Sequence, residues 1–202
     1  FDFAGSSSLT VDFCEFRAPS GFGLWATAWT PSGGTIAISD TTLSGPAYAG
    51  YFITLANVGI TMSNVTATAG ASAGHGIALQ HISGGSTVAL TDVAASHGTG
   101  SGLVMWTCSD MAVTVSGGTY AGPQGGLRLN KVVKVTIAVN TAAVMTGTNP
   151  VHMLGNSVDS YVTVASDCTA AKIRIEDTIA QSLKIDATLL PAGIHYEVER
   201  VT

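Results

Sequence analysis

The sequence predicts an all-β protein, a right-handed parallel β-helix (solenoid) of about seven or eight coils with a period of about 24 residues. Two observations lead to this prediction. Apolar residues make up 46% of the 202 residues and charged residues only 10%, with 24 glycines, a composition that favours strands and tight turns over helices. In addition, an apolar-x-apolar pair recurs eight times at nearly constant spacing.

The recurring pair predicts one strand in every coil, because residues at i and i+2 of a strand share one face and can stack on the next coil. Its copies are Val11-x-Phe13, Ile36-x-Ile38, Ile60-x-Met62, Val88-x-Leu90, Val113-x-Val115, Ile137-x-Val139, Val162-x-Val164 and Leu183-x-Ile185. A second pair recurs in step, mostly after a glycine: Leu24-x-Ala26, Ile53-x-Leu55, Ile77-x-Leu79, Leu103-x-Met105, Leu127-x-Leu129, Val151-x-Met153 and Ile173-x-Ile175.

A polar turn residue follows the first pair in several coils, at Glu15, Asp40, Asn64 and Asp92. Asn and Asp tolerate left-handed backbone and bond neighbouring backbone groups, so these positions predict a stacked column of turns. A weaker third apolar position comes next, at Phe16, Leu43, Val65, Val93, Val144, Cys168 and Leu189.

The pattern Gly76-Ile77-x-Leu79, continued by Val88-x-Leu90-x-Asp92-Val93, resembles the repeat of the pectin-lyase-like superfamily of right-handed parallel β-helices. The likeness extends over roughly residues 9–190 and is closest to the bacteriophage tailspike and fibre type. That superfamily also includes polysaccharide lyases, glycoside hydrolases and secreted adhesins. The resemblance implies the fold, but no catalytic motif of the family can be placed here residue by residue.

We expect one β-helical domain over residues 1–190, with residues 1–20 as the first coil or a cap and residues 191–202 as a C-terminal cap strand. The C-terminal stretch carries more charge than the middle, and solenoids need polar ends to avoid end-to-end stacking. Because the sequence begins with Phe1 rather than Met, we expect it to derive from a longer protein.

Charge and motif patterns exclude several function classes. The net charge is −5 and no Lys/Arg cluster is long enough to neutralise a row of phosphates, so we expect no nucleic-acid partner. No apolar run has the length of a membrane span.

Cys14, Cys108 and Cys168 form no CxxC pattern and are interpreted as free thiols, without a metal site or cofactor. His75 and His97, in Gly-rich loops, are interpreted as surface residues.

Side chains alternate along a strand, so the inward pairs also define the outer surface. Outside the first pair lies a small, uncharged column: Ala37, Thr61, Ala89, Thr114, Ala138 and Thr163. Such a flat face suits packing against further copies of the chain, and we expect a homotrimer around a threefold axis. A solvated surface and an ice-binding face are the alternatives.

The surface outside the second pair is richer in functional groups: Trp25, Gln80, Trp106, Arg128, Asn130 and His152. Aromatic rings beside Arg, Asn and Gln provide the ring stacking and directional hydrogen bonds that a sugar needs. We therefore expect this face to bind a bacterial surface polysaccharide. The alternative is that the tryptophans pack under loops or against a neighbouring subunit.

Asp40, Asp92 and Asp110 are the candidate catalytic acids. Asp40 and Asp92 lie two predicted coils apart, about 9–10 Å by strand spacing, near the separation that glycoside hydrolysis uses. A lyase would instead need a base with a cation, for which Arg128, Lys131 and His152 are the candidates.

The expected function is therefore that of a non-enzymatic virion spike or fibre, exposed at the virion surface, that binds host cell-surface polysaccharide and needs no cofactor. The low charge, the Ala/Thr face and the fold-level resemblance favour this setting. A polysaccharide-degrading hydrolase or lyase of a phage tailspike and a purely structural spacer are the alternatives.

Overall fold

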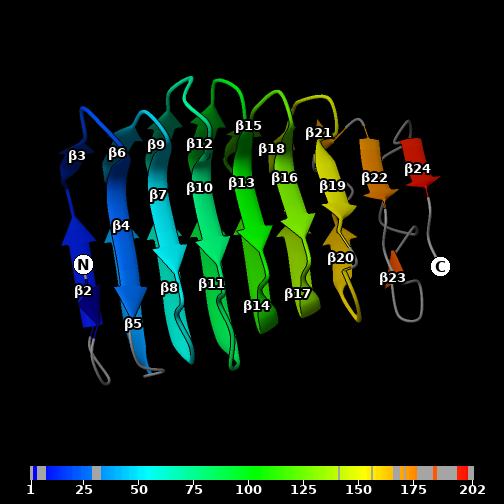
Figure 1. Cartoon of the computed structure of the whole chain (residues 1–202), viewed down its shortest axis with the longest axis horizontal. Coiled ribbons are helices and arrows are strands. Elements are labelled where there is room, and N and C mark those ends of the chain that lie inside the picture. Colours follow the sequence, from blue (N-terminus) through cyan, green and yellow to red (C-terminus); the bar gives the residue numbers. More distant parts are fainter. Residues whose placement is uncertain are drawn as a thin grey trace.

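The chain folds into a parallel β-helix whose coils follow one another along a straight rod (Figure 1). The computed structural model describes residues 2–3, 8–28, 33–140, 142–155, 157–165, 169–170, 172–176, 184–185 and 195–199. Every regular element within these ranges is a β-strand.

Three parallel sheets, named A, B and C here, run along the rod. Sheet A contains β1 (Asp2–Phe3), β4 (Phe22–Ala28), β7 (Tyr48–Ile53), β10 (His75–Gln80), β13 (Ser101–Trp106), β16 (Gly125–Asn130), β19 (Val151–Leu154), β22 (Lys172–Glu176) and β24 (His195–Glu199). Sheet B contains β2 (Ser8–Asp12), β5 (Gly34–Ser39), β8 (Val58–Ser63), β11 (Ser86–Thr91), β14 (Ser109–Ser116), β17 (Val133–Asn140), β20 (Tyr161–Val164) and β23 (Lys184–Ile185). Sheet C contains β3 (Glu15–Arg17), β6 (Thr42–Gly45), β9 (Thr66–Ala69), β12 (Ala94–His97), β15 (Thr119–Ala121), β18 (Val144–Met145) and β21 (Thr169–Ala170).

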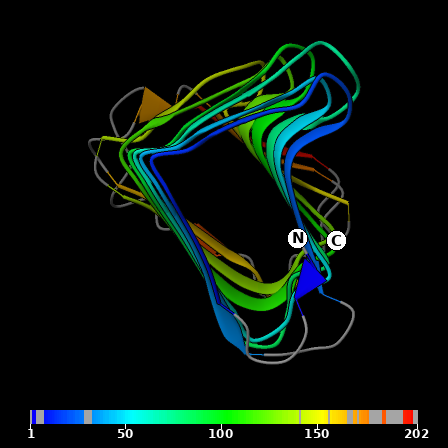
Figure 2. The ribbon, with the colours of Figure 1, turned by 90° about the vertical axis from the view of Figure 1, so that its left-hand side faces the viewer.

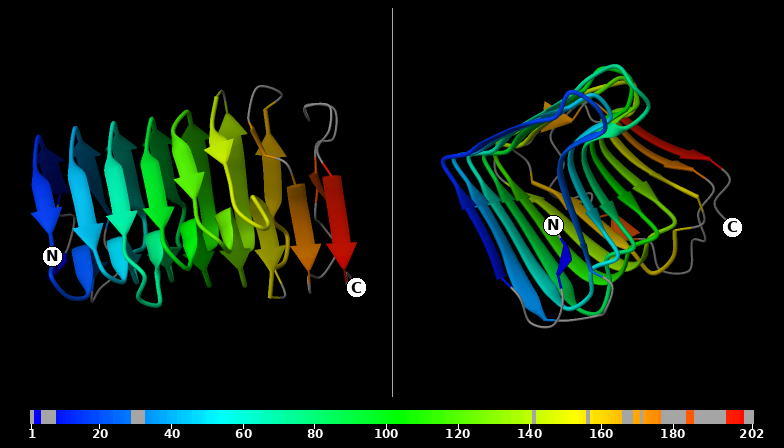
Figure 3. Two further views of the ribbon diagram at one scale, coloured as in Figure 1. Left: turned by 90° about the horizontal axis from the view of Figure 1, so that it is seen from above. Right: turned by 60° about the vertical axis from the view of Figure 1, so that its left-hand side comes forward.

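Each coil passes through sheets A, B and C in that order, and equivalent strands of successive coils lie side by side (Figure 3). Seen from the N-terminal end in Figure 2, the chain runs clockwise as it recedes, so the helix is right-handed. The predicted fold class is confirmed. The solenoid has about six turns with a period of about 25 residues, slightly fewer turns than expected.

The core is built from the inward pairs, which stack from coil to coil in register. In sheet B, for example, Ile60 pairs with Ile36 and Val88, and all three are buried. Parallel strands buried on one face against the interior favour such β-branched side chains. The eight strands predicted from the first pair are the eight strands of sheet B.

The first coil has a different register from the prediction. Leu9 and Val11 lie opposite the inward pair of β5, so the inward pair is Leu9-x-Val11 rather than Val11-x-Phe13. Phe13 lies beyond the end of β2, with a φ of +50° and 80% exposure, and its N–H donates to the carbonyl of Ser39. An apolar residue occupies an exposed corner, which the periodic pattern alone could not reveal.

The register of β7 also corrects the prediction. Gly50 and Phe52 lie opposite the inward pair of β10, in place of the predicted Ile53 and Leu55. Ile53 lies on the outer face, and Leu55 is buried in the corner that follows the strand. Consequently Tyr51, between the two inward residues, faces outward.

Left-handed residues stack at the corner between sheets B and C. Phe13, Asp40, Asn64 and Asp92 have φ values of +50°, +45°, +52° and +51°. Each donates its backbone N–H to a carbonyl of the next coil. The predicted turn column is present, although the first coil contributes Phe13 rather than Glu15.

Sheet C was the least accurately predicted. Leu43 is buried as expected and Phe16, which pairs with it, packs against the core, whereas Val65 and Val93 are buried one position before their strands begin. Val144 lies beside the exposed Thr119 and faces outward. The remaining predicted positions, Cys168 and Leu189, lie outside the residues that the structure describes.

Candidate functional site

The six predicted ligand-binding residues all lie on the outer face of sheet A. The strand register places them in two columns. Trp25, Tyr51, Ala78, Val104, Arg128, His152 and Arg174 form one, and Thr27, Ile53, Gln80, Trp106, Asn130 and Leu154 form the other.

Stacked aromatic rings cover this face in β4 and β7. The ring centroid of Phe22 lies 5.2 Å from Tyr48 and 5.1 Å from Tyr51, and the two tyrosines are 4.8 Å apart. Trp25 lies 5.3 Å from Phe22 and is 49% exposed. Such spacings are typical of favourable ring contacts, so the rings form a rigid apolar platform.

The platform continues along the axis through His75 to Trp106. The Trp106 ring lies edge-on to His75 at 4.7 Å and to Tyr48 at 6.5 Å. We call Phe22, Trp25, Tyr48, Tyr51, His75 and Trp106 the aromatic ladder. The sequence analysis found only its two tryptophans. Leu24, Gly50 and Ile77 are spaced nearly evenly along the sequence. That spacing could have identified Gly50 as an inward position and so placed the next residue, Tyr51, on the outer face.

His75 and His97 are buried, which overturns their interpretation as surface residues. The Nδ1 of His75 accepts the N–H of Ser101, and burial lowers the pKa of His75 to about 3, with His97 and Arg128 adding to the effect. The Nδ1 of His97 accepts the N–H of Gly100, and its Nε2 lies 3.1 Å from the carbonyl of Ala47. Both imidazoles are therefore neutral at pH 7, and their hydrogen bonds hold the segment that leads into β13 against the aromatic ladder.

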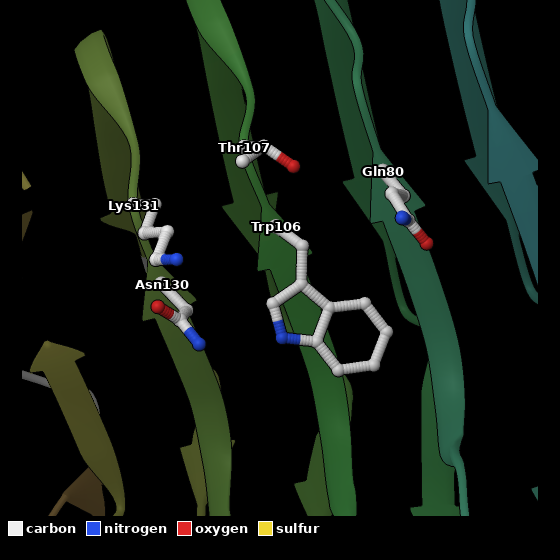
Figure 4. Close-up of a pocket in the computed structure, with 5 residues that line it drawn as sticks. All are labelled: Gln80, Trp106, Thr107, Asn130 and Lys131. Atoms are coloured by element: carbon white, nitrogen blue, oxygen red, sulfur yellow. The ribbon is translucent and has the colours of Figure 1, made fainter. Parts of the chain in front are cut away.

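The first hollow on this face, the Trp106 hollow, has a volume of about 380 Å³ and is lined by Gln80, Trp106, Thr107, Asn130 and Lys131. The indole of Trp106 lies between Gln80 of β10 and Asn130 of β16 (Figure 4). The Gln80 side chain is oriented by the hydroxyl of Tyr51, which donates to Gln80 Oε1. An aromatic surface is thus flanked by amides that both donate and accept hydrogen bonds.

A second hollow, the Arg128 hollow, has a volume of about 390 Å³ and is lined by Pro123, Gln124, Arg128, Thr148, Asn149 and His152. The Nη1 of Arg128 donates to Gln124 Oε1. The Nε2 of His152 lies 3.2 Å from Glu176 Oε2, which also forms an ion pair with Arg174, 2.9 Å from its Nε. Burial lowers the pKa of His152 and outweighs its hydrogen bond to Glu176.

The three candidate catalytic acids lie at corners rather than on sheet A. Asp40 and Asp92 belong to the B–C turn column, where Asp40 Oδ1 accepts from Asn64 Nδ2 at 2.6 Å. Asp110, with a φ of +47°, lies in the second residue of β14, where the chain enters sheet B. All three side chains are exposed.

The predicted Ala/Thr column does lie in register on the outer face of sheet B, from Ala37 to Thr163. It begins with Thr10, which pairs with Ala37, whereas Asp12 pairs with Ser39. The neighbouring column of β5, β8, β11, β14 and β17 reads Thr35, Gly59, Thr87, Ala112 and Thr136. Threonine therefore alternates between the two columns from coil to coil.

Cys14 is exposed and Cys108 is buried, and both are free thiols, while Cys168 lies outside the described residues. Burial raises the pKa of the Cys108 thiol to about 11. Over the ranges that the structure describes, no three His, Cys, Asp or Glu side chains gather in a way that could hold a metal ion. The same ranges contain no helix long and apolar enough to cross a membrane.

These observations define a class of protein: a parallel β-solenoid with an aromatic ladder and two polar hollows on the outer face of sheet A. The chain matches no known protein family, no curated protein and no solved structure at a significant level.

Proposed function

We propose that the protein is a non-enzymatic β-helix that binds a polysaccharide along the outer face of sheet A. The observation that carries the proposal is the Trp106 hollow, where an indole lies between the side chains of Gln80 and Asn130. A sugar ring has apolar C–H faces and hydroxyl edges. An aromatic surface flanked by amides matches both features.

The fold favours an extended ligand. The aromatic ladder and the two hollows follow the rod axis from β4 to β19. One protein molecule can therefore contact several successive sugar units of a polysaccharide. Strands joined by backbone ladders hold these side chains in place, which limits the entropy lost when the ligand binds.

The proposed setting is a spike or fibre at a virion surface, where the rod binds bacterial surface polysaccharide as a homotrimer. The fold-level resemblance supports this setting by analogy. The flat outer face of sheet B, with Ala37, Thr61, Ala89, Thr114, Ala138 and Thr163, is the surface on which we place the contacts between copies.

The second candidate is an enzyme that cleaves such a polysaccharide. The exposed Asp40 and Asp92 lie in one turn column, two coils apart, or about 9–10 Å by strand spacing. That separation suits an inverting hydrolase, but both residues lie at the B–C corner, away from the aromatic ladder.

Binding to an array of bacterial surface polysaccharides tests the proposal. We expect binding that falls at least tenfold in Trp106→Ala, because the ring contact with the sugar is lost. Phe13→Ala is the matched control, since it removes an exposed ring that lies outside sheet A.

Incubation with each bound polysaccharide separates the two candidates. Release of reducing ends or of unsaturated sugars, abolished by Asp40→Asn or Asp92→Asn, would establish the enzyme. Binding that is equal in Trp106→Ala and in the unmodified protein contradicts stacking of the glycan on Trp106, and no binding at all contradicts the proposed function.

A further inference from the structure

We propose that the bound glycan carries an oxyanion, a carboxylate or a sulfate or phosphate ester, and that Arg128 holds this group in the Arg128 hollow. The inference rests on the proposed function, because it names the chemistry of the ligand on the same face. It is carried by an incompletely bonded guanidinium, a buried acceptor and a local excess of positive charge.

Arg128 is held in place on one side only. Its Nη1 donates to Gln124 Oε1, which lines the same hollow. Its Nε is buried and has no hydrogen-bond partner among the described residues. Buried donors are almost always bonded, and an unbonded one costs stability. The Nε–H and Nη2–H of a guanidinium donate side by side to two oxygens of one oxyanion, which is the contact that would complete Arg128.

Asn149 provides a second group with the same property. It is buried, lines the same hollow, and its Oδ1 has no partner within the described part of the chain. An amide oxygen accepts the hydrogen bond of a sugar hydroxyl. The hollow thus combines a cation with an acceptor, as an acidic sugar unit requires.

The charge distribution on this face favours an anion. The protein has a net charge of −5, yet Arg128 and Arg174 lie in one outward column on either side of His152, and Lys131 directly follows β16. Glu176 is the opposing carboxylate, and it bonds to His152 and Arg174. Burial lowers the pKa of Arg128 and Glu176 partly offsets this, but a guanidinium stays charged at pH 7.

The two hollows lie beside each other. Arg128 and Asn130 point outward two residues apart on β16, about 7 Å by the rise of a strand. Asn130 lines the Trp106 hollow and Arg128 lines its neighbour. One glycan can therefore stack on Trp106 and present its charged group to Arg128.

The test compares polymers that differ in charge. Dextran, dextran sulfate and polygalacturonate are titrated into the protein by calorimetry at physiological salt. We expect the two charged polymers to bind more tightly than dextran. Arg128→Gln should lower their affinity about ten- to a hundred-fold, as expected for a bond to a charged group, and leave dextran binding unchanged.

Two further variants distinguish a specific bond to Arg128 from a nonspecific effect of the protein's net charge. Arg128→Lys keeps the charge but loses the planar fork, so it should restore only part of the affinity. Arg17→Gln removes the same charge from an exposed position on sheet C and should have no effect. Equal losses in Arg17→Gln and Arg128→Gln would mean that net charge alone is responsible, and would overturn the proposal.

The remaining outcomes are also decisive. Binding lost in Trp106→Ala but intact in Arg128→Gln refutes the oxyanion site and leaves the proposed function standing. The reverse pattern refutes stacking on Trp106 and retains the oxyanion site. Inorganic sulfate or phosphate binding as tightly as the polymers indicates a free-ion site and overturns the inference, and no binding of any polymer overturns both proposals.

Discussion

His75 joins the aromatic ladder to the protein interior. Its ring contacts Tyr48 and Trp106 on the outer face, while its Nδ1 accepts the N–H of Ser101 in the next strand. A protonated Nδ1 cannot accept this bond, and the charged ring would face His97 and Arg128. Protonation of His75 therefore removes this bond and opposes folding.

This dependence predicts loss of stability in acid. The pKa of His75 falls from 6.5 in the unfolded chain to about 3 in the folded protein, so the unfolded chain binds one more proton between these values. The contribution to the free energy of unfolding is complete above pH 6.5 and is lost as the pH falls toward 3, on the order of a few kcal/mol.

His75→Asn tests this prediction, because its amide oxygen can accept the Ser101 bond without titrating. Urea unfolding from pH 7 to 4 should show a smaller loss of stability in this variant than in the unmodified protein. His81→Asn, which changes an exposed histidine, should follow the unmodified protein. Parallel curves for His75→Asn and the unmodified protein contradict the assigned pKa.

The burial of His75 and His97 shows what sequence patterns at the residue scale leave out. His97 bonds to the carbonyl of Ala47, which is 50 residues away along the chain. No local periodicity contains such a contact, so both histidines were assigned to the surface. By contrast, Asp40, Asn64 and Asp92 were placed correctly in a turn column, because left-handed backbone is a local preference of these residue types.

At the scale of elements, the glycines at the second position of β10 and β13 have a packing role. A Cβ on Gly102 would lie 2.6 Å from the backbone N of Ala121 and 2.7 Å from the carbonyl of Ala95. Gly76 is similarly enclosed, 2.6 Å from the carbonyl of Gly102. The strands of sheets A and C therefore meet at a bend where the backbones leave no room for a side chain.

Gly102→Ala should consequently lower the free energy of unfolding by about 1–3 kcal/mol, the usual cost of overpacking. Gly59→Ala is the matched control, since its Cβ would make ordinary contacts at 3.7 and 3.8 Å with Thr35 and Thr87. That change should leave stability equal or slightly higher, because alanine restricts the unfolded chain. Urea unfolding midpoints compare the two, and equal shifts contradict the packing role.

How accurately each strand was predicted depends on the sizes of its inward and outward residues. Sheet B was predicted well because its strands alternate between large inward and small outward residues, as in Ile36-Ala37-Ile38. In β7 the inward position is Gly50, and the apolar Ile53 lies outside, so the pattern indicated a shifted pair. That shift hid Tyr51, and with it the centre of the aromatic ladder.

At the scale of the whole molecule, the solenoid separates two kinds of surface. Sheets A and B form different sides of the solenoid (Figure 2). The outer face of sheet A carries large aromatic and cationic side chains, and that of sheet B carries small residues. The sequence predicted this division, since alternation determines which residues face outward. It did not predict the Arg128 hollow, which depends on how Gln124 and Asn149 from the connecting segments lie against β16 and β19.

The alternating threonines on sheet B make this face complementary to itself. In each of five successive coils one column has threonine and the other has alanine or glycine. A neighbouring copy of the trimer that packs on these columns can place its threonines opposite the small residues. Six coils of five residues cover about 480 Å² per copy, or about 950 Å² in a pair, just below the range of stable interfaces.

Association through sheet B is measured by sedimentation velocity from micromolar to about hundred-micromolar protein. We expect a species larger than the monomer, which Thr114→Arg dissociates by placing an unpaired charge in the contact. Ala89→Thr should also weaken it, because the added methyl and hydroxyl fill a recess that a threonine of the other copy needs. Thr66→Arg, on the exposed face of sheet C, should leave the association intact. A monomer at every concentration would exclude sheet B as a contact between copies, and loss of association in Thr66→Arg alone would place that contact on sheet C.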